Sequence, residues 1–106
     1  MRVIYDDAAR IELAQAYSYY EAARQGLGRA FLDEIEEAMT NVTQRPLRWR
    51  RTAGRFRRAL VNRFPYGIIY SVEADEIFVI AFMHLHQKPG YWKSRGSPPE
   101  SGWRAF

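Results

Sequence analysis

Two histidines, a lysine and a tyrosine lie close together near the end of this 106-residue chain, and side chains of these types can move protons. His84 and His86 are two residues apart, so they project from the same face if one strand continues through both. Cleavage of RNA needs a group that takes the 2′-hydroxyl proton, one that protonates the leaving oxygen, and cations that stabilise the charged intermediate. His84, His86 and Tyr91 are therefore the candidate catalytic residues if the protein is a nuclease. The alternative is that the two histidines are structural or simply exposed.

Metal chemistry has little support in the sequence. No Asp, Glu or Cys lies near the two histidines to complete a coordination shell. The chain contains no cysteine, which excludes disulfides and thiolate catalysis and is compatible with a reducing cytosol. We predict neither a metal site nor a bound cofactor.

The segment from Arg45 to Arg63 contains eight arginines and no acidic residue. Residues 1–44 carry four basic and eight acidic side chains, whereas residues 45–106 carry twelve and four, so the net charge of +4 is unevenly distributed. Guanidinium groups offer paired donors that match phosphate oxygens, which favours an anionic partner, either nucleic acid or an acidic protein. A solvated basic edge strand is the alternative. The candidate target-binding cations are Arg55, Arg57, Arg58, Arg63, Lys88 and Arg95.

Tyr91 and Trp92 form an aromatic pair directly after the turn signal Pro89-Gly90. Such a pair could stack on exposed bases or anchor a partner protein. An aromatic pair after a turn also commonly folds back to cover a sheet edge, and we favour this packing role.

The elements that position these side chains begin with a short strand and two helices. The alternating stretch Arg2 to Tyr5, followed by Asp6 and Asp7, predicts a strand and then a helix with an acidic cap. Glycines at Gln25 to Gly28 join two helices into a hairpin, and Pro46 ends the second. Apolar residues recur three and four positions apart in each helix: Leu13, Ala16, Tyr17, Tyr20 and Ala23 in the first, and Phe31, Ile35, Ala38, Met39 and Val42 in the second.

Three further strands are predicted after the helices. They span Phe56 to Phe64, Tyr66 to Glu73 and Ile77 to His84, and the last is apolar on both faces and therefore lies inside the sheet. Ala74-Asp75 makes a tight antiparallel hairpin, and Leu47 to Gly54 is a loop. The order β-α-α-β-β-β predicts an α+β fold, in which the helical hairpin packs on one face of a mostly antiparallel four-stranded sheet.

Length and composition fit one soluble domain. The chain is 47% hydrophobic and 26% charged, a composition typical of a folded globular protein and not of a disordered one. We predict a single domain at residues 1–95 and a flexible C-terminal tail at 96–106, where Pro, Ser and Gly gather. No apolar run approaches the ~18 residues of a membrane span, and acidic residues follow the N-terminus within six positions. We expect a cytoplasmic protein without membrane association.

Four segments, taken in order, resemble the RelE/ParE superfamily of toxins from type II toxin–antitoxin (plasmid stabilization) systems, and most closely its ParE-like branch. They are AARIELAQAYSYYEA, LGRAFLDEIEEA, RRALVNRFPYGIIYSVEADEIFVIAFMH and the ending HxxxxPGYWKSR. Their order and spacing are specific, and the resemblance covers Val3 to about Arg95. It implies a small basic protein that arrests growth when free. It also implies a cognate antitoxin that wraps a C-terminal segment around the toxin, in a possible toxin–antitoxin hetero-oligomer.

The resemblance implies two alternative targets. RelE-like members cut mRNA on the ribosome with scattered basic residues and a late Tyr or His, whereas ParE-like members poison DNA gyrase without such a nuclease set. Arg58 and the ending His84 to Arg95 match the signature positions, but Gln87 stands where many relatives have Arg, with Lys88 next. Gln87 and the acidic second helix favour DNA gyrase over the ribosome.

Two interpretations outside these targets stay open. The first is a non-enzymatic RNA-binding module that contacts the backbone through the arginines and stacks bases on Tyr91 or Trp92. The second is a decayed toxin that keeps only its antitoxin-binding surface.

Overall fold

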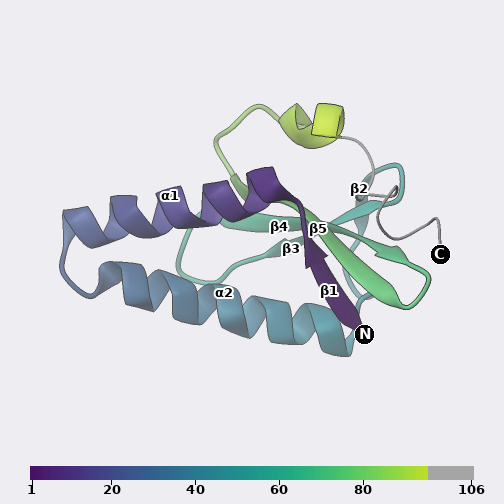
Figure 1. Ribbon diagram of the computed structural model, residues 1–106, viewed down its shortest axis with the longest axis horizontal. Coiled ribbons are helices and arrows are strands. Elements are labelled where there is room, and N and C mark those ends of the chain that lie inside the picture. Colours follow the sequence, from purple (N-terminus) through teal and green to yellow (C-terminus); the bar gives the residue numbers. More distant parts are fainter. Residues whose placement is uncertain (96–106) are drawn as a thin grey trace.

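Two helices cover one face of a five-stranded sheet in the computed structural model, which describes residues 1–95 (Figure 1). The sheet is mixed, because its first strand pairs in parallel with its neighbour and the other strand pairs are antiparallel. This is the predicted α+β architecture with one additional strand. The elements in chain order are β1 (Arg2–Tyr5), α1 (Asp7–Ala23), α2 (Leu27–Gln44), β2 (Arg51–Ala53), β3 (Phe56–Leu60), β4 (Tyr66–Glu73), β5 (Glu76–His84) and the 3-10 helix η1 (Tyr91–Arg95).

The strands are arranged in the order β1-β5-β4-β3-β2. β1 is parallel to β5 and the other neighbours are antiparallel, so the sheet is mostly antiparallel, as predicted. The predicted count of four strands is wrong because β2 lies in the segment Leu47 to Gly54, which was expected to be a loop. Backbone pairing with β3 at the sheet edge holds these three residues, and no alternating apolar pattern marks them. β3 ends at Leu60 and not at the predicted Phe64.

β4 and β5 contribute to hydrophobic cores on both faces of the sheet. β5 lies between β1 and β4, which confirms the interior position that its apolar sequence predicts. The core between sheet and helices includes Phe31, Ile35 and Val42 of α2 and Ile68, Tyr70, Ile77, Val79 and Phe82 of β4 and β5. The cluster on the opposite face contains Ile69, Phe78, Ile80, Ala81, Met83 and Trp92.

α1 and α2 form the predicted helical hairpin, although their connection is shorter than expected because Leu27 and Gly28 already belong to α2. The Glu21 carboxylate accepts hydrogen bonds from the N–H groups of Gly26 at 3.0 Å and of Gly28 at 2.9 Å. N–H groups at the start of a helix have no partner within the helix, and Glu21 supplies one. A Cβ on Gly28 would lie 2.7 Å from Tyr17 Cε1. Glycine is therefore needed where the two helices approach each other.

None of the helices within residues 1–95 combines the length and apolar character of a membrane span. The tail predicted at residues 96–106 lies outside the described residues.

Candidate functional site

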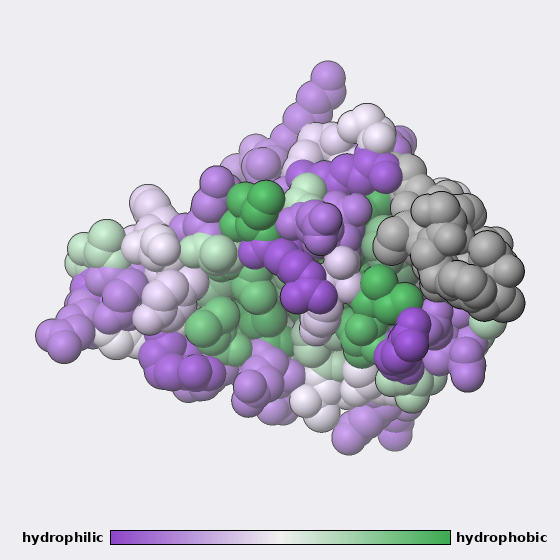
Figure 2. Space-filling model, in the orientation of Figure 1, coloured by the Kyte–Doolittle hydropathy of each residue, from purple (hydrophilic) through white to green (hydrophobic). Residues whose placement is uncertain are grey.

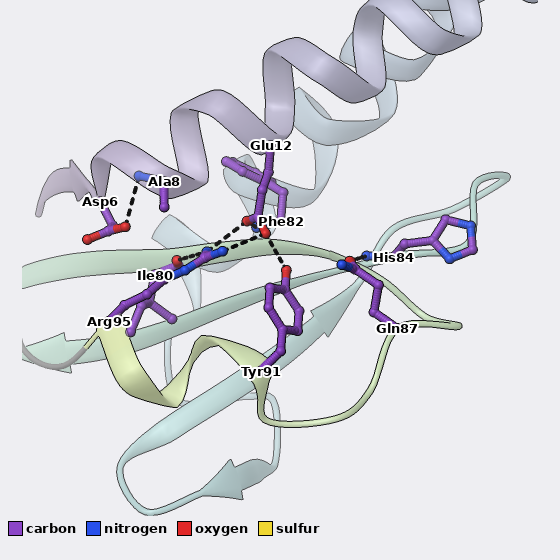
Figure 3. Close-up of polar contacts among 9 residues, drawn as sticks. All are labelled: Asp6, Ala8, Glu12, Ile80, Phe82, His84, Gln87, Tyr91 and Arg95. Atoms are coloured by element: carbon purple, nitrogen blue, oxygen red, sulfur yellow. Dashed lines mark hydrogen bonds and ion pairs between the residues drawn. The ribbon is translucent and has the colours of Figure 1, made fainter.

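Three side chains from distant parts of the sequence meet beside β5 (Figure 3). We call them the Glu12 clasp: Glu12 on α1, and Tyr91 and Arg95 on η1. Arg95 donates one hydrogen bond to each carboxylate oxygen of Glu12, both at 2.9 Å, and the Tyr91 hydroxyl donates to Oε2 at 2.5 Å. The Arg95 guanidinium also lies 5.1 Å from the centroid of the Tyr91 ring. The clasp fastens η1 to the first helix.

The Glu12 clasp also completes an open edge of β5. β1 pairs with β5 only as far as Val79, so the following backbone of β5 has no strand beside it on that edge. The Phe82 N–H donates to Glu12 Oε1 at 3.0 Å, and Arg95 donates to the Ile80 carbonyl at 3.0 Å. Buried backbone polar groups need partners. Two charged side chains supply here the hydrogen bonds that a neighbouring strand would otherwise make.

Burial and the Glu12 carboxylate both disfavour ionisation of the Tyr91 hydroxyl. The side chains of Glu12 and Arg95 are 16% and 19% exposed, so water screens their attraction only in part. Burial raises the pKa of Tyr91, and its hydrogen bond to the Glu12 carboxylate raises it further. The hydrogen bond to Glu12 likewise raises the pKa of Arg95. The Tyr91 hydroxyl is therefore a hydrogen-bond donor at neutral pH and is poorly suited to act as a base.

His84 and His86 are neighbours in space but do not share a strand. β5 ends at His84, as predicted, so the condition under which both histidines would project from one face of a strand is not met. A turn nevertheless brings their ring centroids to 5.0 Å, and His84 Nδ1 accepts a hydrogen bond from the His86 N–H at 3.1 Å. This bond occupies Nδ1 of His84, so Nε2 is the ring nitrogen that His86 does not engage.

The three candidate catalytic residues do not converge on one point. In Figure 3 the Tyr91 ring is directed toward Glu12, and the His84 ring is directed away from both. His84 lines a cavity of about 290 Å³ with Glu12, Tyr66 and other residues, but Tyr91 is not part of its wall. Within residues 1–95, no three His, Cys, Asp or Glu side chains gather closely enough to hold a metal ion. The geometry therefore offers one histidine at a cavity and no assembled acid–base pair.

Several of the predicted target-binding arginines have partners inside the fold. Arg55 forms an ion pair with Glu73 at 2.7 Å, and Arg63 forms a longer one with Glu34 at 3.7 Å. Arg57 donates to backbone carbonyls of the preceding loop, at 2.7 Å in the shorter bond. Since Arg95 belongs to the clasp, four of the predicted cations contribute to the structure itself.

Another group of arginines lines an open hollow of about 380 Å³, which we call the basic cleft. Its walls are formed by Trp49, Arg50, Arg51, Thr52, Arg58 and Leu60. All three arginines are exposed, and no ion pair involves any of them in the part of the chain that the structure describes. Arg55 and Arg63 are exposed but paired, whereas Arg58 is exposed and takes part in no ion pair within residues 1–95. Lys88 is also exposed, on the turn after β5.

Trp92 is buried, with 2% of its surface exposed, and the centroids of the Trp92 and Phe56 rings are 5.1 Å apart. The favoured packing role of Trp92 is therefore confirmed. With Tyr91 held in the clasp, neither aromatic of the predicted stacking pair is free to stack on a base.

An apolar groove of about 570 Å³ lies between α1, α2 and β1, with Phe82 of β5 also in its wall. The groove is lined by Tyr5, Arg10, Leu13, Ala14, Tyr17, Ser18, Leu32 and Phe82. Figure 2 shows this apolar surface between the two helices, with hydrophilic side chains around it. Arg10 places its guanidinium 5.3 Å from the centroid of the Tyr5 ring, so a cation stands at the groove. An apolar groove between two helices suits the apolar face of an amphipathic helix.

Glu12 is the functional residue that the sequence reasoning missed. It lies three residues after Ala9 and four before Ala16, and both alanines are buried, so its carboxylate is on the core side of α1. A single acid within an apolar helical stripe is a signal of a buried polar partner. The partner itself lies 83 residues away, and periodicity within one helix cannot identify it.

Known proteins share both the fold and the sequence features of this chain. A chain of the chromosomal ParDE TA system from P. aeruginosa has the same fold, with a TM-score of 0.71 over 81% of this chain and 97% of that chain. Their sequences are 16% identical, so this likeness concerns the fold alone. No curated protein matches the chain.

The family is shown by the sequence. The family model described as the ParE toxin of the type II toxin–antitoxin system, parDE, matches residues 3–89. The chain therefore belongs to the ParE toxin family, and the resemblance to the ParE-like branch is confirmed.

Proposed function

We propose that this protein is the growth-inhibiting toxin of a type II toxin–antitoxin pair and that a cognate antitoxin neutralises it. The observation that carries the proposal is the match of the ParE toxin family model over residues 3–89. The apolar groove supplies a surface for the partner, because Leu13, Tyr17 and Leu32 line it and can receive the apolar residues of an antitoxin helix. An acidic residue beside that helix's apolar face would meet Arg10. The two chains would form a hetero-oligomer in the cytoplasm.

The proposed target is DNA gyrase, as the resemblance to the ParE-like branch implies. Two features of the site support a mechanism without nuclease chemistry. Tyr91 is a protonated donor bound to Glu12, and its hydroxyl does not face His84 (Figure 3). Gln87, in the position where many relatives have Arg, accepts a hydrogen bond from the His84 N–H at 3.1 Å and so serves the local turn. Arg58 and Lys88 are the predicted cations that are exposed and take part in no ion pair within residues 1–95, so they are available to contact the target.

Ribosome-dependent mRNA cleavage is the competing function, and one observation favours it. His84 lines a polar cavity with its Nε2 not engaged by His86. An imidazole in that position could transfer a proton to or from a bound nucleotide.

Induction of the protein alone separates these targets. We expect growth arrest with gyrase-dependent DNA breakage and intact transcripts, and rescue when the antitoxin is co-expressed. The His84→Ala variant should arrest growth as strongly as the original chain, because gyrase poisoning does not use this imidazole. Transcripts cut at ribosome-positioned sites without DNA damage, together with loss of activity in His84→Ala, would establish the nuclease instead. Absence of any growth defect would indicate a decayed toxin.

The antitoxin-docking proposal has a separate test. Ala14 lies in the wall of the groove and is exposed, so Ala14→Arg should obstruct a docked helix while leaving the hydrophobic core intact. Ala22→Arg makes the same change at an exposed position of α1 outside the groove. In co-expression, the Ala14→Arg toxin should escape neutralisation and fail to copurify with the antitoxin, whereas Ala22→Arg should behave as the original chain. Equal neutralisation of both variants would place the antitoxin elsewhere.

A further inference from the structure

The basic cleft gathers positive charge that no ion pair within residues 1–95 neutralises. Arg50, Arg51 and Arg58 line one hollow, and no carboxylate pairs with them within residues 1–95. Nearby arginines of the same segment are neutralised, as the pairs Arg55–Glu73 and Arg63–Glu34 show. Like charges held around one cleft repel each other, and an anionic ligand would relieve that repulsion.

The loop that carries part of this charge is held in place before any ligand arrives. The Tyr70 hydroxyl donates to the Pro46 carbonyl at 2.5 Å, and Arg57 donates to the Trp49 carbonyl at 2.7 Å. The Arg58 N–H donates to the Arg50 carbonyl at 3.4 Å, which ties the loop to β3. The fold thus fixes the backbone that positions the cleft arginines, and a ligand does not have to order it.

The side-chain stem of Arg58 also has a defined position. It lies over Gly67 of β4, where a Cβ would come within 3.0 Å of Arg58 Cγ. Glycine at this position leaves space for the stem, which then extends toward the cleft.

The chemistry of the walls selects the ligand. Guanidinium groups pair with phosphate oxygens through two parallel hydrogen bonds. Trp49 and Leu60 add an apolar wall, and Leu60 is 56% exposed although it is large and hydrophobic. The volume of about 380 Å³ falls within the range of about 300–1,000 Å³ that is usual for small-ligand sites. A nucleotide combines a phosphate with a flat apolar base and so matches both kinds of wall.

We propose that the basic cleft binds single-stranded nucleic acid, with one base against Trp49 and Leu60 and the adjoining phosphates on Arg50, Arg51 and Arg58. A single strand fits better than a duplex because its bases are not enclosed between neighbours and can enter a hollow. It fits better than an acidic peptide because carboxylates alone would leave the apolar wall uncovered. The cleft shares no residue with the apolar groove, so this binding is independent of the proposed antitoxin site.

Fluorescence anisotropy of the purified full chain tests the proposal. The probes are a fluorescein-labelled oligothymidylate of about 12 nucleotides, within the site sizes of single-strand binding folds, the matching oligouridylate, a duplex of equal length and polyglutamate. We expect at least one of the two single strands to bind more tightly than the duplex and polyglutamate. The tighter of the two single strands then shows whether the cleft prefers DNA or RNA. With three phosphates contacted, log K should fall with log salt at a slope of about −2.

Two double variants with equal loss of charge locate the binding. Arg50→Gln/Arg58→Gln removes two cleft cations and should weaken binding by about tenfold or more and flatten the salt slope by about 1.4. Arg24→Gln/Arg29→Gln removes two exposed cations at the helical hairpin and should change affinity less than about threefold, because only the general attraction of the protein falls. Circular dichroism confirms that each variant is folded.

The proposal is overturned if the two double variants bind alike, or if the duplex or polyglutamate binds more tightly than both single strands. It is also overturned if no single strand binds at low salt. None of these results bears on antitoxin binding, which the groove variants test separately.

Discussion

The Glu12 clasp and the basic cleft use the same side chain in opposite ways. In the clasp, the side chain of Arg95 is 19% exposed, and its guanidinium contacts a carboxylate, a carbonyl and an aromatic ring. In the cleft, three exposed guanidiniums share one hollow and have no ion-pair partner within the described chain. The clasp therefore stabilises the fold, because three hydrogen bonds already engage the Arg95 guanidinium. The cleft keeps its capacity available for another molecule.

The comparison shows why a count of arginines does not locate a binding surface. An arginine paired within the fold has little remaining attraction for a partner, since its charge is neutralised and its donors are occupied. An unpaired arginine keeps its charge and its hydrogen-bond donors available, at a small cost in stability. The difference can be measured as the free energy of unfolding. Removing a residue of the clasp should lower it strongly, whereas removing an arginine of the cleft should raise it slightly.

Glu12→Ala should have the largest effect on stability. It leaves the largely buried Arg95 without its carboxylate and the Phe82 N–H without its acceptor, so we expect a loss of about 3 kcal/mol in the free energy of unfolding. Urea denaturation provides the measurement. Asp33→Ala is the matched control, because it breaks the exposed pair with Arg29 and should cost less than about 0.5 kcal/mol. Similar losses in both variants would show that the clasp does not stabilise the fold.

Alkaline pH should lower the free energy of unfolding, because two tyrosines resist ionisation in the folded state. Burial raises the pKa of Tyr70 from its ordinary value of 10.0 to about 12, and burial also raises the pKa of Tyr91. A group with a raised pKa in the folded state stabilises fully below its unfolded pKa, and this contribution is lost as pH rises from about 10 toward 12. The urea midpoint should therefore fall across this interval. Tyr91→Phe should make the fall shallower, and an unchanged pH profile in that variant would contradict the role assigned to this hydroxyl.

Arg57→Gln should have a moderate effect. Arg57 holds the loop before β2 by donating to the Leu47 and Trp49 carbonyls, and loss of these bonds should cost about 1 kcal/mol. Arg58→Gln is the control on the adjacent residue, since no hydrogen bond of the Arg58 side chain is seen within residues 1–95 and its removal should change stability by less than about 0.5 kcal/mol. Urea denaturation compares the two, and hydrogen exchange should show faster amide exchange around Trp49 only in Arg57→Gln. A reversed order would mean that the loop is held by other contacts.

The sequence predicted those elements whose signals are local. Asp6 caps α1 by accepting a hydrogen bond from the Ala8 N–H, as its place before the apolar stripe indicates. The bounds of β4 agree with the alternation from Tyr66 to Glu73, and the turn Ala74-Asp75 closes the hairpin with β5. β2 was missed because edge pairing, and not burial, determines its conformation.

The site was predicted less well because its geometry depends on contacts between distant residues. The sequence named Tyr91 and Arg95 but not Glu12, which lies 83 residues before Arg95 and joins them. It also grouped eight arginines by composition, although neighbours on β3 differ: Arg57 lies opposite Tyr70 on the helix side, and Arg58 lies opposite Ile69 on the other. Pairing with a distant carboxylate or carbonyl then decides which arginines remain available, and no local pattern encodes it.

Arg50→Gln should have the smallest effect on stability and the opposite sign to Glu12→Ala. Removing one of three cations that share the basic cleft reduces their mutual repulsion, so the free energy of unfolding should rise by a few tenths of a kcal/mol at low salt. The gain should disappear near 1 M salt, where the Debye length is about 3 Å. Urea denaturation at both salt concentrations measures it, with Arg29→Gln as the control, because that change removes a cation already paired with Asp33. A salt-independent loss of stability in Arg50→Gln would show that this arginine has a structural partner, and the contrast between the clasp and the cleft would then no longer hold.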